Sequence, residues 1–132
     1  MKKEIIKVTG AIINKGSSYL IGRRGPNEKS PGLWEFPGGK IEEGEDPEDC
    51  IKRELKEELN IDAEVGDLYT NYIYEYPEVS YDLYFYKITI FSGALVKSVH
   101  DKIEWVKLDK FSNFNFLPGD RPVIKKLRES LI

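Results

Sequence analysis

The chain has 132 residues, 40% of them hydrophobic and 33% charged, with 20 basic and 23 acidic side chains and a formal net charge of −3. This balance is typical of one compact, soluble domain spanning residues 1–132, and the slight acidity argues against stable nucleic-acid binding through a broad basic surface. No uncharged apolar run approaches the roughly 18 residues of a membrane-spanning helix, and the N-terminus has no secretion-signal pattern, so we expect a cytoplasmic protein without membrane association.

The first predicted elements are two strands. Residues 4–14 and 18–23 are rich in β-branched and aromatic residues and are separated by the turn-like sequence NKGS, which predicts a hairpin. The two glycines and two prolines of residues 24–33 predict a loop. A short strand or turn at residues 34–36 follows and ends at the sequence PGG.

A helix is predicted to begin near Asp46, which stands at an N-cap position directly before Pro47. Ile51, Leu55 and Leu59 recur every four residues and give this helix one apolar face. Asn60 stands where the helix should end, because Asn readily adopts the left-handed conformation found after helix C-termini.

The second half of the chain is predicted to contain strands and a final helix. Residues 65–90 favour two strands that are broken at residues 77–78, and residues 103–108 favour another. From about residue 121 to the end, Val123, Ile124, Leu127 and Leu131 form the buried face of an amphipathic helix. Strands with one helix in the middle and one at the end predict a mixed α/β sandwich.

The central predicted helix carries a cluster of carboxylates. Glu54, Glu57 and Glu58 stand at positions i, i+3 and i+4, so they share one helical face, where like charges repel. A hard divalent cation such as Mg²⁺ binds carboxylate oxygens and would offset this repulsion. Arg53 is placed to brace the cluster from the side, and the glycine-rich turn at residues 37–39 lets the backbone approach the same ion.

The alternative interpretation of this helix is an ordinary solvated face, with Lys52 and Lys56 as ion-pair partners of the glutamates. The spacing of the glutamates alone leaves both interpretations open. Cys50 is the single cysteine and His100 the single histidine, which excludes an internal disulfide and a zinc cluster.

Residues 38–61, GGKIEEGEDPEDCIKRELKEELNI, resemble the Nudix box, G-x5-E-x7-R-E-U-x-E-E-x-G-U, where U is aliphatic. The matching residues are Gly39, Glu45, Arg53, Glu54, Leu55, Glu57, Glu58 and Ile61, whereas Asn60 replaces the final glycine. GLWEFPGGKIEEGE upstream and DRPVIKKL near the end are similar to the MutT-type branch of this family, so the resemblance covers essentially the whole chain. It implies the Nudix fold, an αβα sandwich with a mixed, curved sheet and a catalytic loop-helix-loop.

The resemblance implies a Mg²⁺-dependent enzyme, with Mn²⁺ as an alternative metal, that converts a nucleoside triphosphate and water into a nucleoside monophosphate and pyrophosphate. The implied metal ligands are the main-chain oxygen of Gly38 and the side chains of Glu54, Glu57 and Glu58. Glu45 and Arg53 would support this cluster, and Glu54 or Glu57 would orient or deprotonate the attacking water. Such enzymes remove unwanted nucleotides from the precursor pool.

For the substrate, the resemblance implies phosphate contacts from Arg24 and Lys40. Phe36 and Tyr84 are candidates for contacting the base, although both fit a core position as well. Asp120 stands where the bacterial oxidised-guanine enzyme has an asparagine, and it also fits the N-cap of the last helix.

The chemistry of Asp120 leaves two classes of base open. An ionised carboxylate only accepts hydrogen bonds and favours an exocyclic amine, as on cytosine, whereas a protonated carboxyl can serve oxidised guanine. Cytidine-triphosphate pyrophosphohydrolases of this branch are similar in having Asp at this position. The sequence therefore predicts 8-oxo-dGTP, cytosine nucleoside triphosphates or both as substrates.

One position departs from the family pattern. Many relatives carry a glutamate six residues before the tryptophan of the late strand, as a further metal ligand or base. Counting back from Trp105, this position is Val99, followed by His100 and Asp101. Either neighbour could substitute, or the helix glutamates could act alone, while for His100 itself the sequence favours an ordinary loop histidine.

Other functions are compatible with the same fold: a non-catalytic module that senses a nucleotide, the lesion-recognition domain of a DNA glycosylase, or hydrolysis of ADP-ribose or dinucleoside polyphosphates. The complete glutamate set argues against a non-catalytic module. The MutT-like closing segment argues against the other hydrolytic activities. The sequence leaves monomer and homodimer open.

Overall fold

The computed structural model describes residues 3–130. Its elements, in chain order, are β1 (Glu4–Lys15), β2 (Ser18–Arg24), β3 (Trp34–Glu35), β4 (Gly38–Lys40), α1 (Pro47–Leu59), β5 (Asp62–Glu75), β6 (Val79–Ser92), β7 (His100–Lys107), the 3₁₀ helices η1 (Leu108–Asn113) and η2 (Pro118–Asp120), and α2 (Arg121–Glu129). None of the helices within the described range has the length and apolar character needed to cross a membrane.

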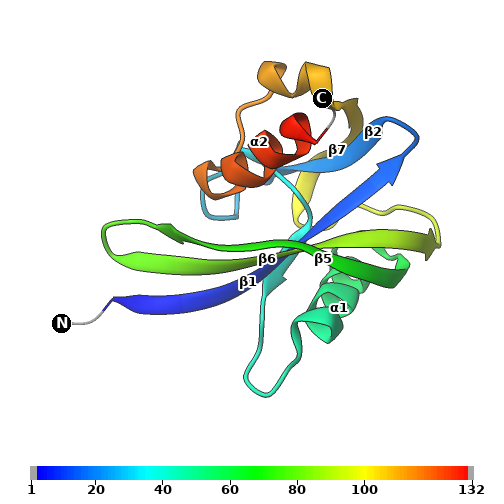
Figure 1. Ribbon diagram of the computed structural model, residues 1–132. Helices are drawn as coiled ribbons and strands as arrows, with labels where there is room; N and C mark the ends of the chain where they lie inside the picture. The colour runs from blue at the N-terminus through cyan, green and yellow to red at the C-terminus, as the bar shows by residue number, and fades with distance from the viewer. Residues whose placement is uncertain (1–2, 131–132) are drawn as a thin grey trace.

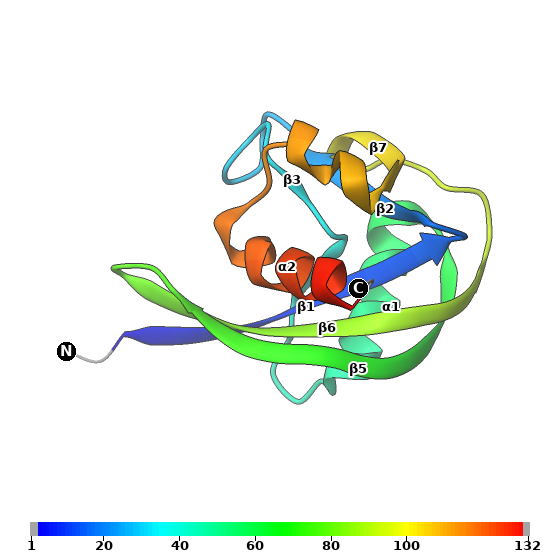
Figure 2. The same cartoon turned by 45° about the horizontal axis from the view of Figure 1, so that its top comes forward.

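The strands form one mixed sheet in the order β3-β2-β1-β6-β5, with β4 paired to β1 and β7 paired to β2. β1 runs parallel to β6 from the Glu4–Val79 pair to the Ile13–Ile88 pair, and the other pairings are antiparallel. β1 is therefore the central strand. The hairpin of β5 and β6 and the start of β1 extend beyond the rest of the molecule (Figures 1 and 2).

The two long helices lie on opposite sides of the strands (Figure 1). One hydrophobic core packs against α2 and η1, and a second packs against α1. Phe85 and Tyr86 are neighbours on β6 but belong to different cores, because successive strand residues point to opposite faces. The predicted αβα sandwich with a mixed sheet is confirmed.

The helix predicted near Asp46 is α1. Pro47 is its first residue, and Asn60 ends it with a φ of 58°, in the left-handed conformation that the sequence predicts. Ile51 and Leu55 are fully buried against the strands. The apolar face therefore packs α1 against the strands, and the polar residues between these positions lie on the other faces of the helix.

The structure differs from the predicted elements in three places. β4 contains two glycines and has little intrinsic strand preference, yet it pairs with β1 between Val8 and Gly10. β7 begins at His100 rather than residue 103, and η1 was not predicted. Leu131, assigned to the buried face of the last helix, lies outside the described residues.

Candidate functional site

A cavity of about 900 Å³ opens at the edge of α1. Its lining comes from α1, the glycine-rich strand β4, the loop after β2, the tip of the β5–β6 hairpin and the segment 117–120 before α2. Ligand sites commonly have volumes of about 300 to 1,000 Å³, so the cavity is large enough for a nucleotide.

The structure brings the three carboxylates of α1 to this cavity. Glu54, Glu57 and Glu58 all line it, with side-chain exposures of 15%, 60% and 6%. Lys56, one of the lysines of the solvated-face interpretation, instead lies 3.6 Å from the carboxylate of Asp62. The glutamates therefore face a cavity at one end of the helix rather than forming pairs with lysine along its surface.

Arg53 provides the counter-charge for this cluster. Its guanidinium donates two hydrogen bonds to Glu45, at 2.8 and 3.0 Å, and its Nη1 donates to Glu54 at 3.0 Å and Glu57 at 3.2 Å. Its Nη2 also donates to the main-chain oxygen of Lys40 at 3.1 Å. The hydrogen bonds from Arg53 lower the pKa of Glu45 to about 2. Arg53 thus braces the cluster from the side, as predicted.

Glu58 is a buried carboxylate with unused bonding capacity. Within residues 3–130 its Oε2 has no hydrogen-bond partner, and its Oε1 lies 4.0 Å from Nε2 of His100. Burial raises the pKa of Glu58, and the neighbouring Glu54 and Glu35 raise it further. A buried carboxylate without a partner is unfavourable, and a bound cation would satisfy it.

The glycine-rich turn lies against the same carboxylates. A Cβ atom at Gly39 would overlap the carboxylate of Glu54, and one at Gly38 would overlap the carbonyl oxygen of Thr9. At Gly38 the obstacle is backbone, so glycine is required there, whereas at Gly39 an added methyl group would displace the flexible side chain of Glu54.

The donor set of this site fits a hard divalent cation. Carboxylate and main-chain oxygens are the ligands that Mg²⁺ prefers, and the orphaned oxygen of Glu58 lies among them. Within residues 3–130, no three carboxylate, imidazole or thiol groups already converge as they would around an ion. Arg53 holds Glu54 and Glu57, so binding of a cation would redirect these two side chains from the guanidinium.

Replacing Gly39 by alanine tests the contact between the turn and α1. Gly39→Ala should fold but weaken Mn²⁺ binding by about tenfold or more, because the added methyl group displaces the Glu54 carboxylate. Titration with Mn²⁺ followed by electron paramagnetic resonance measures the affinity. Gly16→Ala is the control for lost stability: its φ of 58° strains the backbone, but nothing among the described residues lies within 4 Å of the added atom, so Mn²⁺ binding should be unchanged. Unchanged Mn²⁺ binding in Gly39→Ala would refute a role for Glu54 as ligand.

The two residues expected to contact phosphate also line the cavity. Arg24 lies at the end of β2, donates from Nη1 to Glu35 at 2.8 Å and donates from Nε to the carbonyl oxygen of Lys29. Lys40 has an exposed side chain at the end of β4. Both cations therefore stand beside the cavity, where they can meet an anionic ligand.

Asp120 lines the cavity from the segment before α2 and is 8% exposed. It occupies the N-cap position of α2 but makes no capping hydrogen bond. Instead, its Oδ2 accepts a hydrogen bond from the backbone N–H of Phe36 at 2.9 Å. Burial, with a further contribution from Glu35, raises the pKa of Asp120 to about 8. Helix capping therefore does not account for this carboxylate.

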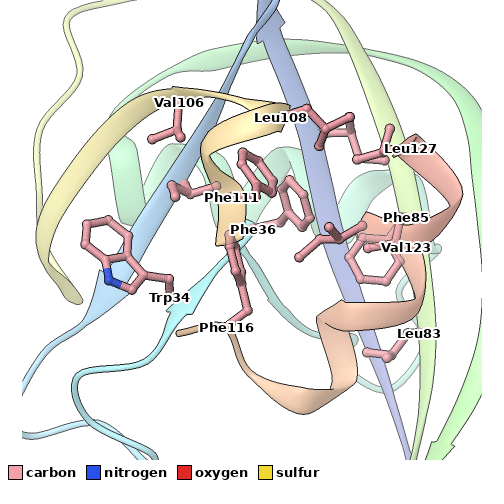
Figure 3. Packing of buried hydrophobic residues seen from close by; sticks show 13 residues of the cluster. Trp34, Phe36, Leu83, Phe85, Val106, Leu108, Phe111, Phe116, Val123 and Leu127 are labelled. Carbon is pink, nitrogen blue, oxygen red and sulfur yellow. The ribbon is translucent and has the colours of Figure 1, made fainter. Parts of the chain in front are cut away.

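The side chains of Phe36 and Tyr84 are not brought to the cavity lining. Phe36 is 3% exposed and packs among aromatic core residues (Figure 3), with its ring centroid 6.1 Å from those of Phe85 and Phe111. Tyr84 donates its hydroxyl hydrogen bond to Asp82 at 3.1 Å and packs against the core beside α1. In this structure both are packing residues.

His100 was expected to be an ordinary loop histidine, and this expectation is wrong. It is the first residue of β7, is 3% exposed and lies with Nε2 2.9 Å from Oε2 of Glu35. Gly22 makes room for the imidazole, because a Cβ atom there would lie 2.6 Å from the ring, but the sequence alone gave no reason to relate the two residues. Sequence analysis also missed Glu35, which lines the cavity.

The neighbours of His100 do not supply the missing family glutamate. Val99 lines the cavity with an apolar side chain. Asp101 accepts hydrogen bonds from Arg23 at 2.7 and 3.0 Å and is not part of the lining. Any carboxylate chemistry in the cavity therefore comes from other positions.

The sandwich fold and the carboxylate helix beside a nucleotide-sized cavity suit a hydrolase of phosphoric anhydride bonds. A model of the NUDIX domain matches residues 4–127, and the chain belongs to the Nudix family. It is 36% identical over 128 residues to the 8-oxo-dGTP diphosphatase of Escherichia coli K12, covering 97% of this chain and 98% of that protein. It is 30% identical over 122 residues to the CTP pyrophosphohydrolase of the same organism, covering 92% and 90%.

The fold is also found in solved structures of the family. The MutT protein from Methanosarcina mazei Go1 superposes with a TM-score of 0.87 and 25% identity, covering 98% of this chain and 97% of that one. Nudix hydrolases generally use divalent metal ions, which agrees with the oxygen-rich donor set beside α1.

Proposed function

We propose that the protein is a Mg²⁺-dependent nucleoside triphosphate pyrophosphohydrolase of the nucleotide pool. Its substrates are 8-oxo-dGTP, cytosine nucleoside triphosphates or both, and its products are a nucleoside monophosphate and pyrophosphate. The observation that carries this proposal is a single cavity lined by the carboxylates of α1, by the cations Arg24 and Lys40, and by Asp120. The names of the two E. coli relatives support these two classes of base.

The polyphosphate side of the cavity suits an anion bound through metal. Glu54, Glu57, Glu58 and the main-chain oxygen of Gly38 would hold Mg²⁺, with Mn²⁺ as an alternative. When bound, such an ion neutralises phosphate charge, polarises phosphoryl oxygens and lowers the pKa of a bound water. Arg24 and Lys40 would add positive charge for the phosphates, since both line the cavity.

The reaction needs a group that accepts a proton from water. Glu54 or Glu57 orients the water and takes its proton while the water oxygen bonds to phosphorus. The bridging bond between the α- and β-phosphates breaks, and pyrophosphate leaves. Arg53 keeps its hydrogen bonds to Glu45 and so supports α1 and the preceding loop from the side.

The base is selected in the part of the cavity that Asp120 lines. Asp120 is buried there, with Oδ2 occupied by the N–H of Phe36, so Oδ1 is the oxygen left for a base. Tyr76 and Tyr81, with ring centroids 5.6 Å apart, line the same cavity from the β5–β6 hairpin and can pack against a flat ring.

The proposal is tested by Mg²⁺-dependent pyrophosphate release at micromolar concentrations of 8-oxo-dGTP, dGTP, dCTP, CTP and 5-methyl-dCTP. A preference for 8-oxo-dGTP over dGTP would establish a pool-sanitising enzyme, and a preference for cytosine nucleotides would indicate control of pyrimidine nucleotides. No release with any of these, while ADP-ribose is hydrolysed, would refute the proposed substrate class. Metal binding without any turnover would favour a nucleotide-sensing module.

A further inference from the structure

A chain of four polar side chains runs along the wall of the cavity, and three of its members line the cavity. Arg24 donates to Oε1 of Glu35 at 2.8 Å, and the other oxygen of Glu35 lies 2.9 Å from Nε2 of His100. The same Nε2 lies 4.0 Å from Oε1 of Glu58. These residues come from β2, β3, β7 and α1, so tertiary structure alone brings them together.

His100 differs from the other three members in its exposure. Arg24, Glu35 and Glu58 line the cavity, whereas the side chain of His100 has 0% exposure and lies outside the lining. It therefore has no access to a ligand in the cavity. Its contacts are with the groups that have such access.

The fold makes space for this imidazole. Its ring lies against Gly22 of β2, where a Cβ atom would approach to 2.6 Å. In the part of the chain that the structure describes, its Nδ1 is buried without a hydrogen-bond partner, which is an unfavourable arrangement in a core that could hold an apolar side chain instead. Packing alone therefore does not explain a histidine at this position, whereas the contact of its Nε2 with Glu35 does.

We infer that His100 is a positioning residue: by donating from Nε2 to Glu35 it fixes this carboxylate between Arg24 and Glu58. Without this bond Glu35 would be held by Arg24 alone, through Oε1, and its other oxygen could change position relative to the like charge of Glu58. Through Glu35, His100 keeps Arg24, the proposed phosphate contact, and Glu58, the proposed metal ligand, in a fixed arrangement. The inference rests on the proposed function in that Glu58 is taken as a metal ligand.

The test compares two substitutions of the imidazole. His100→Leu fills the space but removes the donor, and it should raise the Mn²⁺ dissociation constant of the nucleotide-free protein by about ten- to a hundredfold. His100→Gln keeps a side-chain N–H donor and should remain within about threefold of the wild type. Mn²⁺ titration by electron paramagnetic resonance gives the constants, and KM and kcat for the best nucleotide are measured in parallel.

Val106→Ala is the matched control for loss of core packing. Val106 is a buried residue of β7 in the core beside α2 and is not part of the cavity lining, so this variant should lose stability but keep Mn²⁺ binding. Wild-type Mn²⁺ binding in His100→Leu, or an equal loss in His100→Gln, would overturn the inference. If His100→Leu does not fold, Glu35→Gln tests the same link: weaker Mn²⁺ binding supports it and unchanged binding overturns it.

The two proposals fail in different ways. Mn²⁺ binding is measured without a nucleotide, so absence of turnover on the nucleotide panel would refute the proposed function and leave the positioning role of His100 standing. Nucleotide turnover by the wild type, together with normal Mn²⁺ binding in His100→Leu, would support the proposed function and refute the positioning role of His100.

Discussion

Glu57→Gln should fold like the wild-type protein and lose at least about a hundredfold in kcat for nucleotide hydrolysis. The substitution keeps the size of the side chain but removes the negative charge that a divalent cation requires. The Glu57 side chain is 60% exposed, and Arg53 retains its bonds to Glu45 and Glu54 without it. We therefore expect a change in the free energy of unfolding of no more than about 0.5 kcal/mol.

The measurements are pyrophosphate release at increasing Mg²⁺ concentrations and thermal unfolding of the metal-free protein. Glu48→Gln is the matched control, because Glu48 is an exposed residue in the first turn of the same helix and lies outside the cavity. Activity that recovers at high Mg²⁺ would identify Glu57 as a ligand, and activity that stays low would identify it as the base. Near wild-type kcat in Glu57→Gln would rule out both roles.

The sequence predicted α1 and its carboxylate cluster because both depend on local spacing. Asp46, Pro47 and Asn60 mark the ends of the helix, and a helical period places Glu54, Glu57 and Glu58 on one face whatever surrounds them. Arg53 could also be anticipated as a brace from its place beside Glu54. Its bidentate hydrogen bonds to Glu45 follow from the resemblance to the family motif rather than from spacing.

The contact between Glu35 and His100 could not be predicted in this way. Glu35 and His100 are separated by 65 residues in the chain, and they meet because β2 pairs with both β3 and β7. Pairings between distant strands depend on topology, and the parallel pairing of β1 with β6 was also not predicted. A one-dimensional pattern therefore gave no reason to join these two residues.

The aromatic candidates show a second limit, which is the alternation of side chains along a strand. The sequence YDLYFYKI contains Tyr84, Phe85 and Tyr86 in succession, and a shift of one residue exchanges the two faces. The structure places Phe85 in the core beside α2 and Tyr84 beside the core at α1. Where apolar and aromatic residues follow one another, as at residues 83–86, composition does not determine which face each one occupies.

The base preference of the enzyme should change with pH in the wild type and stay constant in Asp120→Asn. Burial raises the pKa of Asp120 to about 8, so the folded protein carries this carboxyl protonated at neutral pH. Since Oδ2 accepts from the N–H of Phe36, the proton resides on Oδ1, which then donates to a base oxygen such as that of oxidised guanine. Above about pH 8 the ionised group only accepts and favours the amine of cytosine.

The expected result is that the ratio of kcat/KM for 8-oxo-dGTP to that for dCTP falls by up to about tenfold per pH unit above the pKa of Asp120. Asn mimics the protonated acid, because its oxygen can accept from Phe36 while its amide N–H donates to the base. Asp120→Asn should therefore keep the low-pH preference at pH 9. A constant ratio in the wild type, or the same fall in Asp120→Asn, would contradict Asp120 as the base-reading residue.

The protonation of Asp120 also predicts how the stability of the folded protein changes with pH. The pKa of Asp120 is 3.8 when unperturbed and about 8 in the folded protein, so between these values the folded state retains a proton that the unfolded state releases. This contribution favours folding below pH 3.8 and is lost as the pH rises to about 8. Asp120→Asn lacks this loss. As the pH rises from about 5 to about 8, its melting temperature should therefore increase relative to that of the wild type. Equal pH dependence of the two melting temperatures would show that Asp120 does not carry the proton, and would leave an ionised, amine-reading carboxylate in the cavity at neutral pH.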